Sequence, residues 1–375
     1  MYKRLKVKLY PTKNQIEMLE NHFDGYRFAY NLSLEYKQKK ELIAKKQEEI
    51  KILISGGTGF LGGYTAKFLK SKGYEIGVLG RNLEKAKNLQ NEGIKFYEID
   101  FSMEEQIEEL INIMNDYDYV VHSGAMSSIC GSYKDFYNAN VLGSKNMVEA
   151  SIKANIKKFI HISSPSIYYD YKDRLNVEET FLPQKFANHY AKTKYEAEQL
   201  LKLYKEKIEI IILRPRAIIG PGDTSIFPKL IALNNRRGIP LFNKGKSIID
   251  VTYVKNVSHA IELSILNNKE LSGEAYNITN GEPGNIKELL DYFFNLINQK
   301  VRYISVPIVI MNGIGRIFEV VSKITNKDVI LTRYSIGVLI NSFTLNIEKA
   351  KKDLNYEPII SLKDGLEEYS KLIEK

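Results

Sequence analysis

A tyrosine and a lysine four residues apart, Tyr190 and Lys194, form the pair of side chains in this sequence best suited to moving a proton. The segment from about His189 to Tyr204 is predicted to be helical, so both side chains lie on one helix face. A free tyrosine has a pKa of about 10, and a neighbouring ammonium group favours its ionised form. The sequence therefore predicts that Tyr190 is an acid/base and that Lys194 tunes its pKa.

A second chemical feature is the segment Ile50 to Gly62, IKILISGGTGFLG, in which an apolar run leads into Gly56, Gly59 and Gly62. A strand, a glycine-rich turn and a helix predicted from Phe60 to Lys72 would present backbone N–H groups to a pyrophosphate. Glycine permits the close backbone approach that this ligand needs. The spacing is GxxGxxG and not the commoner GxGxxG, so the interpretation depends on the neighbouring elements.

Strands and helices alternate in the segments that must position these residues. Further strands are predicted at Glu75 to Leu79, Phe96 to Ile99, Tyr119 to His122 and Phe159 to Ser163, with helical periodicity between them. Such alternation is typical of a doubly wound parallel α/β sheet. We expect a Rossmann fold with a smaller C-terminal substrate lobe.

Further motifs follow the glycines in a definite order. They are Asp100-Phe101, VVHSGA (120–125), NVLGS (140–144), FIHISSPSIY (159–168), YAKTK (190–194), LRPRAIIGPGD (213–223) and AYNITNGEP (275–283). With GGTGFLG (56–62), this series resembles the extended short-chain dehydrogenase/reductase superfamily, specifically its NAD-dependent epimerase/dehydratase and 3β-hydroxysteroid dehydrogenase group. The resemblance covers about Glu49 to Lys375 and implies an NAD(P)-dependent oxidoreductase.

The resemblance also implies roles for individual residues. Ser164, 26 residues before Tyr190, falls where the family places a Ser or Thr that polarises the substrate carbonyl, and Ser166 is the alternative. Lys194 would hold the ribose hydroxyls. Asn140 would support the lysine through water, or it is a helix-packing residue. The histidines are expected to be packing or strand-end residues and not ligands: His122, His161 and His189.

The implied cofactor site comprises three groups of residues besides Asn140, Tyr190 and Lys194. The glycine turn supplies Gly56, Thr58, Gly59, Phe60, Leu61 and Gly62. Asp100 and Phe101 would flank the adenine, and Ser123-Gly124-Ala125 would pass beneath the nicotinamide ribose. No metal site is expected.

The end of the second strand indicates which dinucleotide is preferred. NAD-dependent proteins commonly place Asp or Glu there to bind the ribose 2′-OH, whereas an Arg accommodates the 2′-phosphate of NADP. This chain reads Val78-Leu79-Gly80-Arg81-Asn82, with no carboxylate at the turn. Arg81 therefore favours NADP over NAD, although an Arg exposed at a helix start would give the same sequence.

Departures from the family pattern bear on the substrate. Nucleotide-sugar epimerases and dehydratases usually carry an Asn soon after LR and an Arg just before the motif at 250–254, whereas this chain has Pro215-Arg216 and Ile248-Ile249 there. Ser164 also lacks the following Asp-Glu pair of dehydratases. The run Val306 to Val321 would suit an apolar ligand or an ordinary core. We expect interconversion of a secondary alcohol and a 3-oxo group on an apolar substrate. Alternatives are a nucleotide-sugar epimerase or reductase, and a non-catalytic dinucleotide- or nucleic-acid-binding protein.

Composition narrows the class of protein further. Length allows two domains, and the single cysteine, Cys130, excludes an intrachain disulfide and a cysteine metal cage. A reducing cytoplasm is the expected compartment. The start lacks the pattern of a signal peptide. Asn312 and Arg316 interrupt the longest apolar run, which is shorter than the ~20 residues of a membrane span. A homodimer through the Tyr190 helix is a further expectation from the resemblance.

The first 46 residues form a basic extension, with 11 Lys and Arg against 5 Asp and Glu. KVKLYPTKNQIEMLENHF and YRFAYNLSLEYK resemble the N-terminal helix-turn-helix of OrfB-type transposon nucleases, without the nuclease's catalytic domain. A fused fragment without a role is one interpretation. The other is weak nucleic-acid contact through Lys3, Arg4, Lys6, Lys8 and Arg27.

These features give the expected domain organisation. Residues 1–46 are the extension, and Gln38 to Glu49 is a helical linker. Residues 49–215 form the Rossmann domain, which receives a strand from 251–254. Residues 216–375 mainly form the substrate lobe.

Overall fold

The computed structural model describes residues 50–127, 131–304 and 333–373, together with residues 12, 13, 18, 22, 30, 31, 33, 34 and 37. The chain divides into two units, Met1–Glu49 and Ile50–Lys375. In the first unit, residues 13, 18, 22, 30, 31, 33, 34 and 37 are helical, and the Ser33 hydroxyl donates to the Tyr30 carbonyl at 2.8 Å. The basic residues proposed for nucleic-acid contact and the linker at 38–49 lie outside the described residues.

A parallel sheet organises the second unit. Its order is β12-β7-β5-β4-β1-β2-β3, and every neighbouring pair is parallel, which confirms the predicted doubly wound sheet. The seven strands are β1 (Lys51–Ser55), β2 (Glu75–Gly80), β3 (Lys95–Glu98), β4 (Tyr119–His122), β5 (Lys158–Ile162), β7 (Glu209–Pro215) and β12 (Glu274–Ile278).

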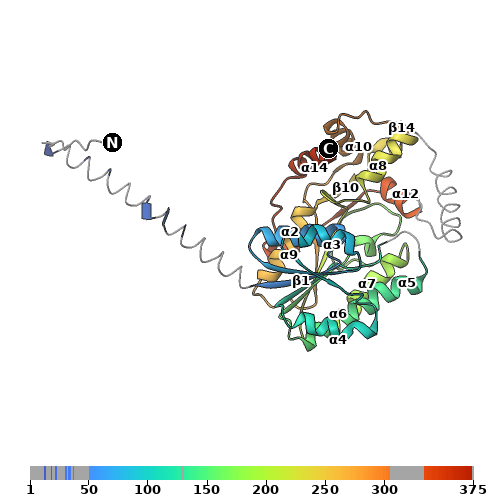
Figure 1. Cartoon of the computed structure of the whole chain (residues 1–375). Helices are drawn as coiled ribbons and strands as arrows, with labels where there is room; N and C mark the ends of the chain where they lie inside the picture. The colour runs from blue at the N-terminus through green and yellow to red at the C-terminus, as the bar shows by residue number, and fades with distance from the viewer. Residues whose placement is uncertain are drawn as a thin grey trace. The chain divides into compact units, whose positions relative to one another are not determined.

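Helices cover both faces of this sheet because its strands are apolar on both sides. Side chains alternate along a strand, so Ile52 and Ile54 face one helical layer and Leu53 faces the other. Figure 1 shows α2 (Phe60–Ser71), α3 (Leu83–Gln90) and α9 (Val254–Leu266) on one side of β1. On the other side lie α4 (Ile107–Met114), α6 (Gly143–Lys153) and α7 (His189–Lys202). The two helical layers enclose separate apolar cores.

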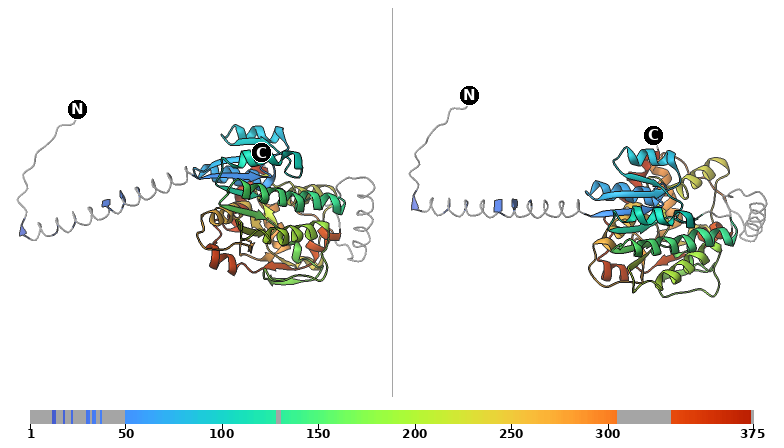
Figure 2. Two further views of the ribbon diagram at one scale, coloured as in Figure 1. Left: turned by 90° about the horizontal axis from the view of Figure 1, so that it is seen from below. Right: turned by 60° about the horizontal axis from the view of Figure 1, so that its bottom comes forward.

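Shorter elements complete this domain. The helix α5 (Tyr133–Tyr137) leads through a π-helical turn, Asn138–Leu142, into α6. In both views of Figure 2 the green helices α5, α6 and α7 lie beside one another. Two 3₁₀ turns, Glu104–Gln106 and Pro165–Tyr168, follow β3 and β5, and α13 (Glu348–Leu354) packs against the core beneath α9.

The strand predicted at 251–254 does not join the central sheet, so that prediction is wrong. The segment holds only β11 (Thr252–Tyr253), which pairs with β8 (Ile218–Ile219), and α9 begins at Val254. The seventh strand is β12, in the AYNIT run, whose register places Ala275 beside Ile212 of β7. Which strand pairs with β7 depends on segments distant in the sequence, and the runs at 251–254 and 274–278 have similar apolar patterns.

The remaining elements form the C-terminal lobe. Its core contains Phe227 of α8 (Phe227–Arg236), Phe293 of α10 (Ile286–Leu296) and Tyr369 of α14 (Leu362–Ile373). A four-stranded sheet joins β13 (Gly284–Asn285), β10 (Ile248–Ile249), β15 (Phe343–Leu345) and β6 (Arg174–Val177). Also present are β9 (Ile239–Pro240), β14 (Tyr303–Ile304), α12 (Arg333–Ile340) and a 3₁₀ turn, Asn243–Gly245.

The strand order places a topological switch at β1. Its neighbours β2 and β4 are reached by connections that run in opposite directions across the sheet. Open α/β sheets bind ligands at such a point, beyond the carboxyl ends of the strands. The glycine turn after β1 and the segments that follow β4 and β5 all lie at this edge.

Candidate active site

The glycine turn after β1 has no room for side chains at two of its three glycines. Gly56 has a φ of +69°, and a Cβ there would lie 2.8 Å from the Gly124 backbone. A Cβ on Gly62 would lie 2.4 Å from the Gly56 carbonyl oxygen and 2.7 Å from Ser123 Oγ. The Gly59 N–H donates to the Gly56 carbonyl at 2.9 Å, closing the turn. Glycine is therefore required by geometry at Gly56 and Gly62.

This turn fits the pyrophosphate of a dinucleotide. It leads into α2, whose N-cap residue, Gly59, has no side chain to bond the first free N–H groups of the helix. Those donors and the positive end of the helix dipole favour an anion. When bound, a nicotinamide dinucleotide supplies or accepts a hydride.

The end of β2 carries Arg81, as the sequence indicated. Its guanidinium lies 3.1 Å from Asp100 Oδ2, and its side chain is 76% exposed. A Cβ on the preceding residue, Gly80, would meet Thr58 Oγ1 at 2.8 Å, so this strand end touches the glycine turn. Burial raises the pKa of Asp100, but hydrogen bonds from Ser102 and the charge of Arg81 lower it overall. Arg81 and Asp100 are thus an ion pair at the rim of the turn.

The segment after β4 is fixed against the end of β1. Ser123 Oγ donates to the Ser55 carbonyl at 2.6 Å, and the Gly124 N–H donates to Ser55 Oγ at 3.2 Å. The Phe101 ring packs edge-on against His122, and a Cβ on Gly124 would meet this ring at 2.5 Å. The predicted residues 123–125 therefore line the switch point, and the Phe101 side chain supports them from below.

Tyr190 and Ser164 come together at the end of β5. Ser164 is the N-cap of the 3₁₀ turn after β5, where its Oγ accepts from the Ser166 N–H at 3.2 Å, and its side chain lies near enough to Tyr190 on α7 to affect the pKa of that tyrosine. Burial raises the pKa of Tyr190 to about 12, although the interaction with Ser164 lowers it. Ser166 Oγ, the alternative polariser, is buried with no hydrogen-bond partner among the described residues. Of the two serines, Ser164 is the one that interacts with Tyr190.

Lys194 lies deeper in the domain than the sequence indicated. Its Nζ donates to the Ile162 carbonyl at 2.7 Å and lies 3.2 Å from His161 Nε2. Burial lowers the pKa of Lys194 to about 8, although the charge of Glu198 raises it. An ammonium group has three N–H donors, so one remains for a ribose hydroxyl. Burial has the largest effect on the pKa of Tyr190, and a lowering of that pKa by Lys194 stays a prediction.

Two buried histidines support this arrangement from within the sheet. His122 Nδ1 lies 2.7 Å from Ser55 Oγ, and its Nε2 lies 3.1 Å from Ser144 Oγ. Burial, followed by the charge of Lys194, lowers the pKa of His122 to about 3 and that of His161 well below its usual value. Both histidines are therefore neutral. His161 does more than pack, since it contacts Lys194.

Asn140 lies in the π-helical turn and contacts the neighbour of Lys194. Its amide donates to Thr193 Oγ1 at 3.1 Å and to the Met126 carbonyl, and its Oδ1 accepts from the Met126 N–H. These contacts fix the segment after β4 against α7. His189, at the start of α7, packs its ring against Tyr133 and Phe136.

A buried ion pair that was not predicted from the sequence, Arg214 with Glu198, connects α7 to β7. Arg214 of β7 donates to both carboxylate oxygens of Glu198, which also accepts from Ser163. Arg214 also donates to the Tyr168 hydroxyl and, at 2.9 Å, to the Glu179 carbonyl. The only sequence signal was Glu198 one helical turn after Lys194. This network connects the ends of β5 and β7 to the helix of Tyr190.

The remaining predictions concern metal binding, membrane contact, the single cysteine and the longest apolar run. Within the described ranges, no group of three or more His, Cys, Asp or Glu side chains could hold a metal ion. No helix among the described residues is long and apolar enough to cross a membrane. Cys130 and the apolar run Val306 to Val321 lie outside the described residues.

Comparison with known proteins agrees with this geometry. The profile of the NAD dependent epimerase/dehydratase family matches residues 52–279, and a helix-turn-helix domain profile matches residues 1–41. Both resemblances expected from the motifs are thereby confirmed.

Individual relatives cover most of the chain. The uncharacterized protein YbjS of Escherichia coli (strain K12) is 32% identical over 85% of this chain and 96% of its own length. The 2-alkyl-3-oxoalkanoate reductase of Stenotrophomonas maltophilia (strain K279a) is 28% identical over 84% of this chain and 97% of its own. A decarboxylating sterol-4-alpha-carboxylate 3-dehydrogenase of Candida albicans (strain SC5314) is 29% identical, with coverage of 84% and 95%.

A solved structure shares the fold. UDP-glucuronic acid 4-epimerase from Bacillus cereus, in complex with NAD, is 23% identical and superposes with a TM-score of 0.69. The match covers 87% of this chain and 96% of the epimerase. At this identity the likeness shows the fold alone.

Proposed function

Because the chain belongs to the NAD-dependent epimerase/dehydratase family, we propose that it interconverts a ketone and a secondary alcohol at a 3-oxo or 3-hydroxy position of an apolar substrate. The observation that carries the proposal is the proximity of the Tyr190 and Ser164 side chains at the carboxyl end of β5. This proximity supports the pairing of a proton donor with a second hydroxyl group at the strand edge that carries the glycine turn.

The residues divide the chemistry of reduction among them. Tyr190 is protonated at neutral pH because burial raises its pKa to about 12, so its hydroxyl can give a proton to the carbonyl oxygen. The Ser164 hydroxyl donates a hydrogen bond to the same oxygen and stabilises the negative charge that develops there. Lys194 holds the ribose with its remaining N–H, and Ile162 and His161 fix its position. A bound reduced nicotinamide would supply the hydride to the carbonyl carbon while Tyr190 supplies the proton to the oxygen, so one ketone gives one secondary alcohol.

Two relatives support the 3-position and the apolar substrate. One is named for reduction of 2-alkyl-3-oxoalkanoates and the other for 3-dehydrogenation of sterol carboxylates, and both align over more than four fifths of this chain. For the cofactor we propose NADP, because Arg81 follows β2 directly and an Arg at this turn accommodates a 2′-phosphate.

A panel of carbonyl substrates tests the proposal. Oxidation of NADPH and NADH by the full chain is followed with 3-oxosteroids, long-chain 2-alkyl-3-oxo acids and UDP-sugars. We expect turnover of an apolar 3-oxo compound, with NADPH preferred. Turnover confined to UDP-sugars would replace this proposal with the nucleotide-sugar epimerase or reductase alternative.

A further inference from the structure

Two arginines at the end of β7 have similar burial but very different partners. Arg214 is 4% exposed and Arg216 is 7% exposed. Arg214 pairs with Glu198, whereas the Arg216 guanidinium has no ion pair within 4 Å and its Nε has no hydrogen-bond partner among the described residues. An arginine remains charged in a folded protein, and an unpaired buried charge is unfavourable. The charge of Arg214 is therefore neutralised within the protein, whereas that of Arg216 is not paired within the part of the chain that the structure describes.

The backbone of Arg216 is fixed by hydrogen bonds, although its guanidinium has no ion-pair partner among the described residues. Its N–H donates to the Ile278 carbonyl at 3.0 Å, and its own carbonyl accepts from the Thr252 hydroxyl. The guanidinium stacks over the ring of Phe343, with 4.6 Å between Cζ and the ring centroid. A contact with the ring face uses none of the N–H donors of the guanidinium, which can therefore still bind an anion.

The side chains around Arg216 connect it to the candidate active site. Tyr334 of α12 interacts electrostatically with both Arg216 and Tyr190. Tyr169, which ends the 3₁₀ turn that Ser164 begins, lies 5.4 Å from the Tyr334 ring and 5.9 Å from the Phe343 ring. The aromatic wall formed by Tyr169, Tyr334 and Phe343 thus extends from the proton-transfer residues to Arg216.

The nearest carboxylate does not satisfy this arginine. Asp250 interacts with Arg216 electrostatically, but no ion pair forms within 4 Å. Its Oδ2 instead accepts from the Leu345 N–H at 2.7 Å. Burial raises the pKa of Asp250 to about 6, so this carboxylate is ionised at neutral pH, but it lies beyond ion-pair distance of the guanidinium. The charge of Arg216 remains available to a ligand.

We propose that Arg216 binds a carboxylate of the substrate, so that the preferred substrate is a 3-oxo or 3-hydroxy acid with an apolar chain. This inference rests on the proposed function and adds the residue that selects the acid. The planar guanidinium can bind a carboxylate through two parallel hydrogen bonds. A few polar groups in an otherwise apolar site fix the orientation of a ligand. Binding at Arg216 would turn the 3-carbon toward Tyr190 and Ser164.

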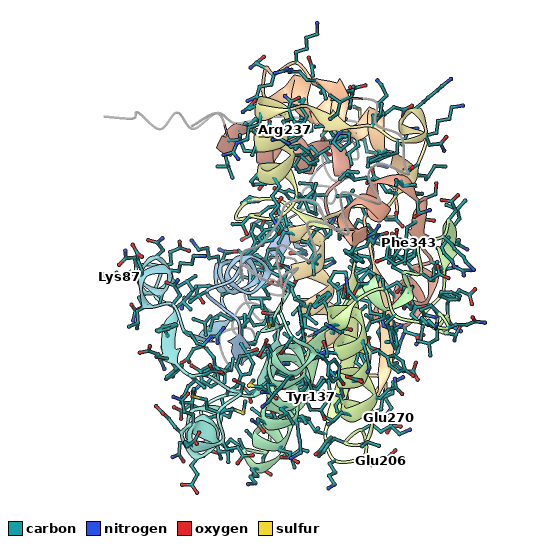
Figure 3. All side chains as sticks on the ribbon, turned by 90° about the vertical axis from the view of Figure 1, so that its right-hand side faces the viewer. Lys87, Tyr137, Glu206, Arg237, Glu270 and Phe343 are labelled. Atoms are coloured by element: carbon teal, nitrogen blue, oxygen red, sulfur yellow. The ribbon has the colours of Figure 1, made fainter. Side chains whose placement is uncertain are left out.

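An acid and its neutral ester separate this role from general binding. The probes are a long-chain 2-alkyl-3-hydroxy acid and its methyl ester, oxidised with NADP⁺ by the full chain and its variants. Arg216→Gln should raise KM for the acid by roughly 30-fold or more, the effect of truncating one partner of a buried charge pair. KM for the ester should stay within about 3-fold of wild type, since the ester forms no charge pair. The matched control is Arg237→Gln at the exposed end of α8, far from Phe343 in Figure 3.

Thermal denaturation supplies a second readout. Removal of an unpaired buried charge should leave the midpoint of Arg216→Gln unchanged or higher, whereas removal of a structural ion pair would lower it. Arg216→Lys keeps the charge but not the planar fork, so it should raise KM for the acid and leave that for the ester unchanged. This second variant carries the test if Arg216→Gln does not fold.

A rise in KM for the acid alone supports the inference. Equal changes for acid and ester, or a lowered melting midpoint with no acid-specific effect, would overturn it while leaving the proposed function intact. An effect only on turnover of UDP-glucose would mean that the bound anion is a diphosphate, and the carboxylate assignment would be wrong. If wild type oxidises neither probe nor reduces any 3-oxo compound of the panel, the proposed function itself fails.

Discussion

Replacing Gly62 by alanine tests whether the turn after β1 holds the dinucleotide. The new Cβ would lie 2.4 Å from the Gly56 carbonyl oxygen, about 1 Å short of ordinary contact at 3.4 Å. The same carbon would lie 2.7 Å from Ser123 Oγ, which bonds the Ser55 carbonyl. The turn can relieve both overlaps only by moving away from α2, and that movement displaces the N–H groups that face the pyrophosphate.

The expected loss follows from the size of the overlap. Extra methyl groups in well-packed sites typically cost about 1–3 kcal/mol. At 1.4 kcal/mol per tenfold, this range corresponds to a roughly 5- to 140-fold increase in the Kd for NADPH. The same overlap also lowers the free energy of unfolding, and this loss is offset in part because Gly62 lies within α2, where alanine is favoured over glycine by about 1 kcal/mol.

Calorimetric titration of NADPH into wild type and Gly62→Ala measures this directly, with the melting midpoint as the check on folding. The matched control is Gly284→Ala in β13, where a Cβ would meet no atom within 4 Å. The control should bind NADPH like wild type. Unchanged affinity in Gly62→Ala would refute the assignment of this turn as the pyrophosphate site.

Three further predictions concern the rim of the site and its buried charges. Arg81→Ala should raise KM for NADPH about 10-fold, the effect of about 1.4 kcal/mol of lost charge-assisted bonding, and leave that for NADH nearly unchanged; equal changes in steady-state assays would exclude a 2′-phosphate contact. Lys194 has its pKa lowered to about 8 by burial, so the folded chain holds this proton less tightly than the unfolded chain. The free energy of unfolding of wild type, measured in urea, should therefore rise by about 3 kcal/mol between pH 8 and pH 10.5 relative to that of Lys194→Met. If the free energies of the two proteins instead change in parallel with pH, Lys194 is not desolvated. Arg214→Met should lower the free energy of unfolding by about 3–5 kcal/mol, because it leaves the Glu198 carboxylate buried and unpaired. Adding Glu198→Gln to Arg214→Met should restore part of this free energy. A loss of less than about 3 kcal/mol in Arg214→Met would mean that water reaches the ion pair.

The features that the sequence predicted well are those with local physical causes. Gly56 and Gly62 are recognisable because the close packing of this turn leaves no room for a side chain, and the strands β1 and β4 because both of their faces are apolar. The four-residue spacing of Tyr190 and Lys194 follows from the helical period. Each of these properties lies within a few consecutive residues.

The features that the sequence did not predict depend on distant parts of the chain. The seventh strand could not be distinguished from the short run at 251–254, because β12 is selected by its pairing with β7. Burial of Lys194 against His161, and of Arg214 against Glu198, depends on how α7 packs on the sheet. The unpaired state of Arg216 could not be predicted, since its sequence looks the same with or without a partner.

The central claim is that Tyr190 is the acid/base of a dinucleotide-dependent redox reaction. Tyr190→Phe removes one hydroxyl and leaves α7 and the glycine turn in place, so turnover of the best 3-oxo substrate and the Kd for NADPH are measured together. We predict that kcat falls by about 100-fold or more, within the range for a lost general acid, while the Kd for NADPH stays within about 3-fold of the wild-type value. Turnover equal to wild type would contradict the assignment of Tyr190 and, with it, the proposed mechanism.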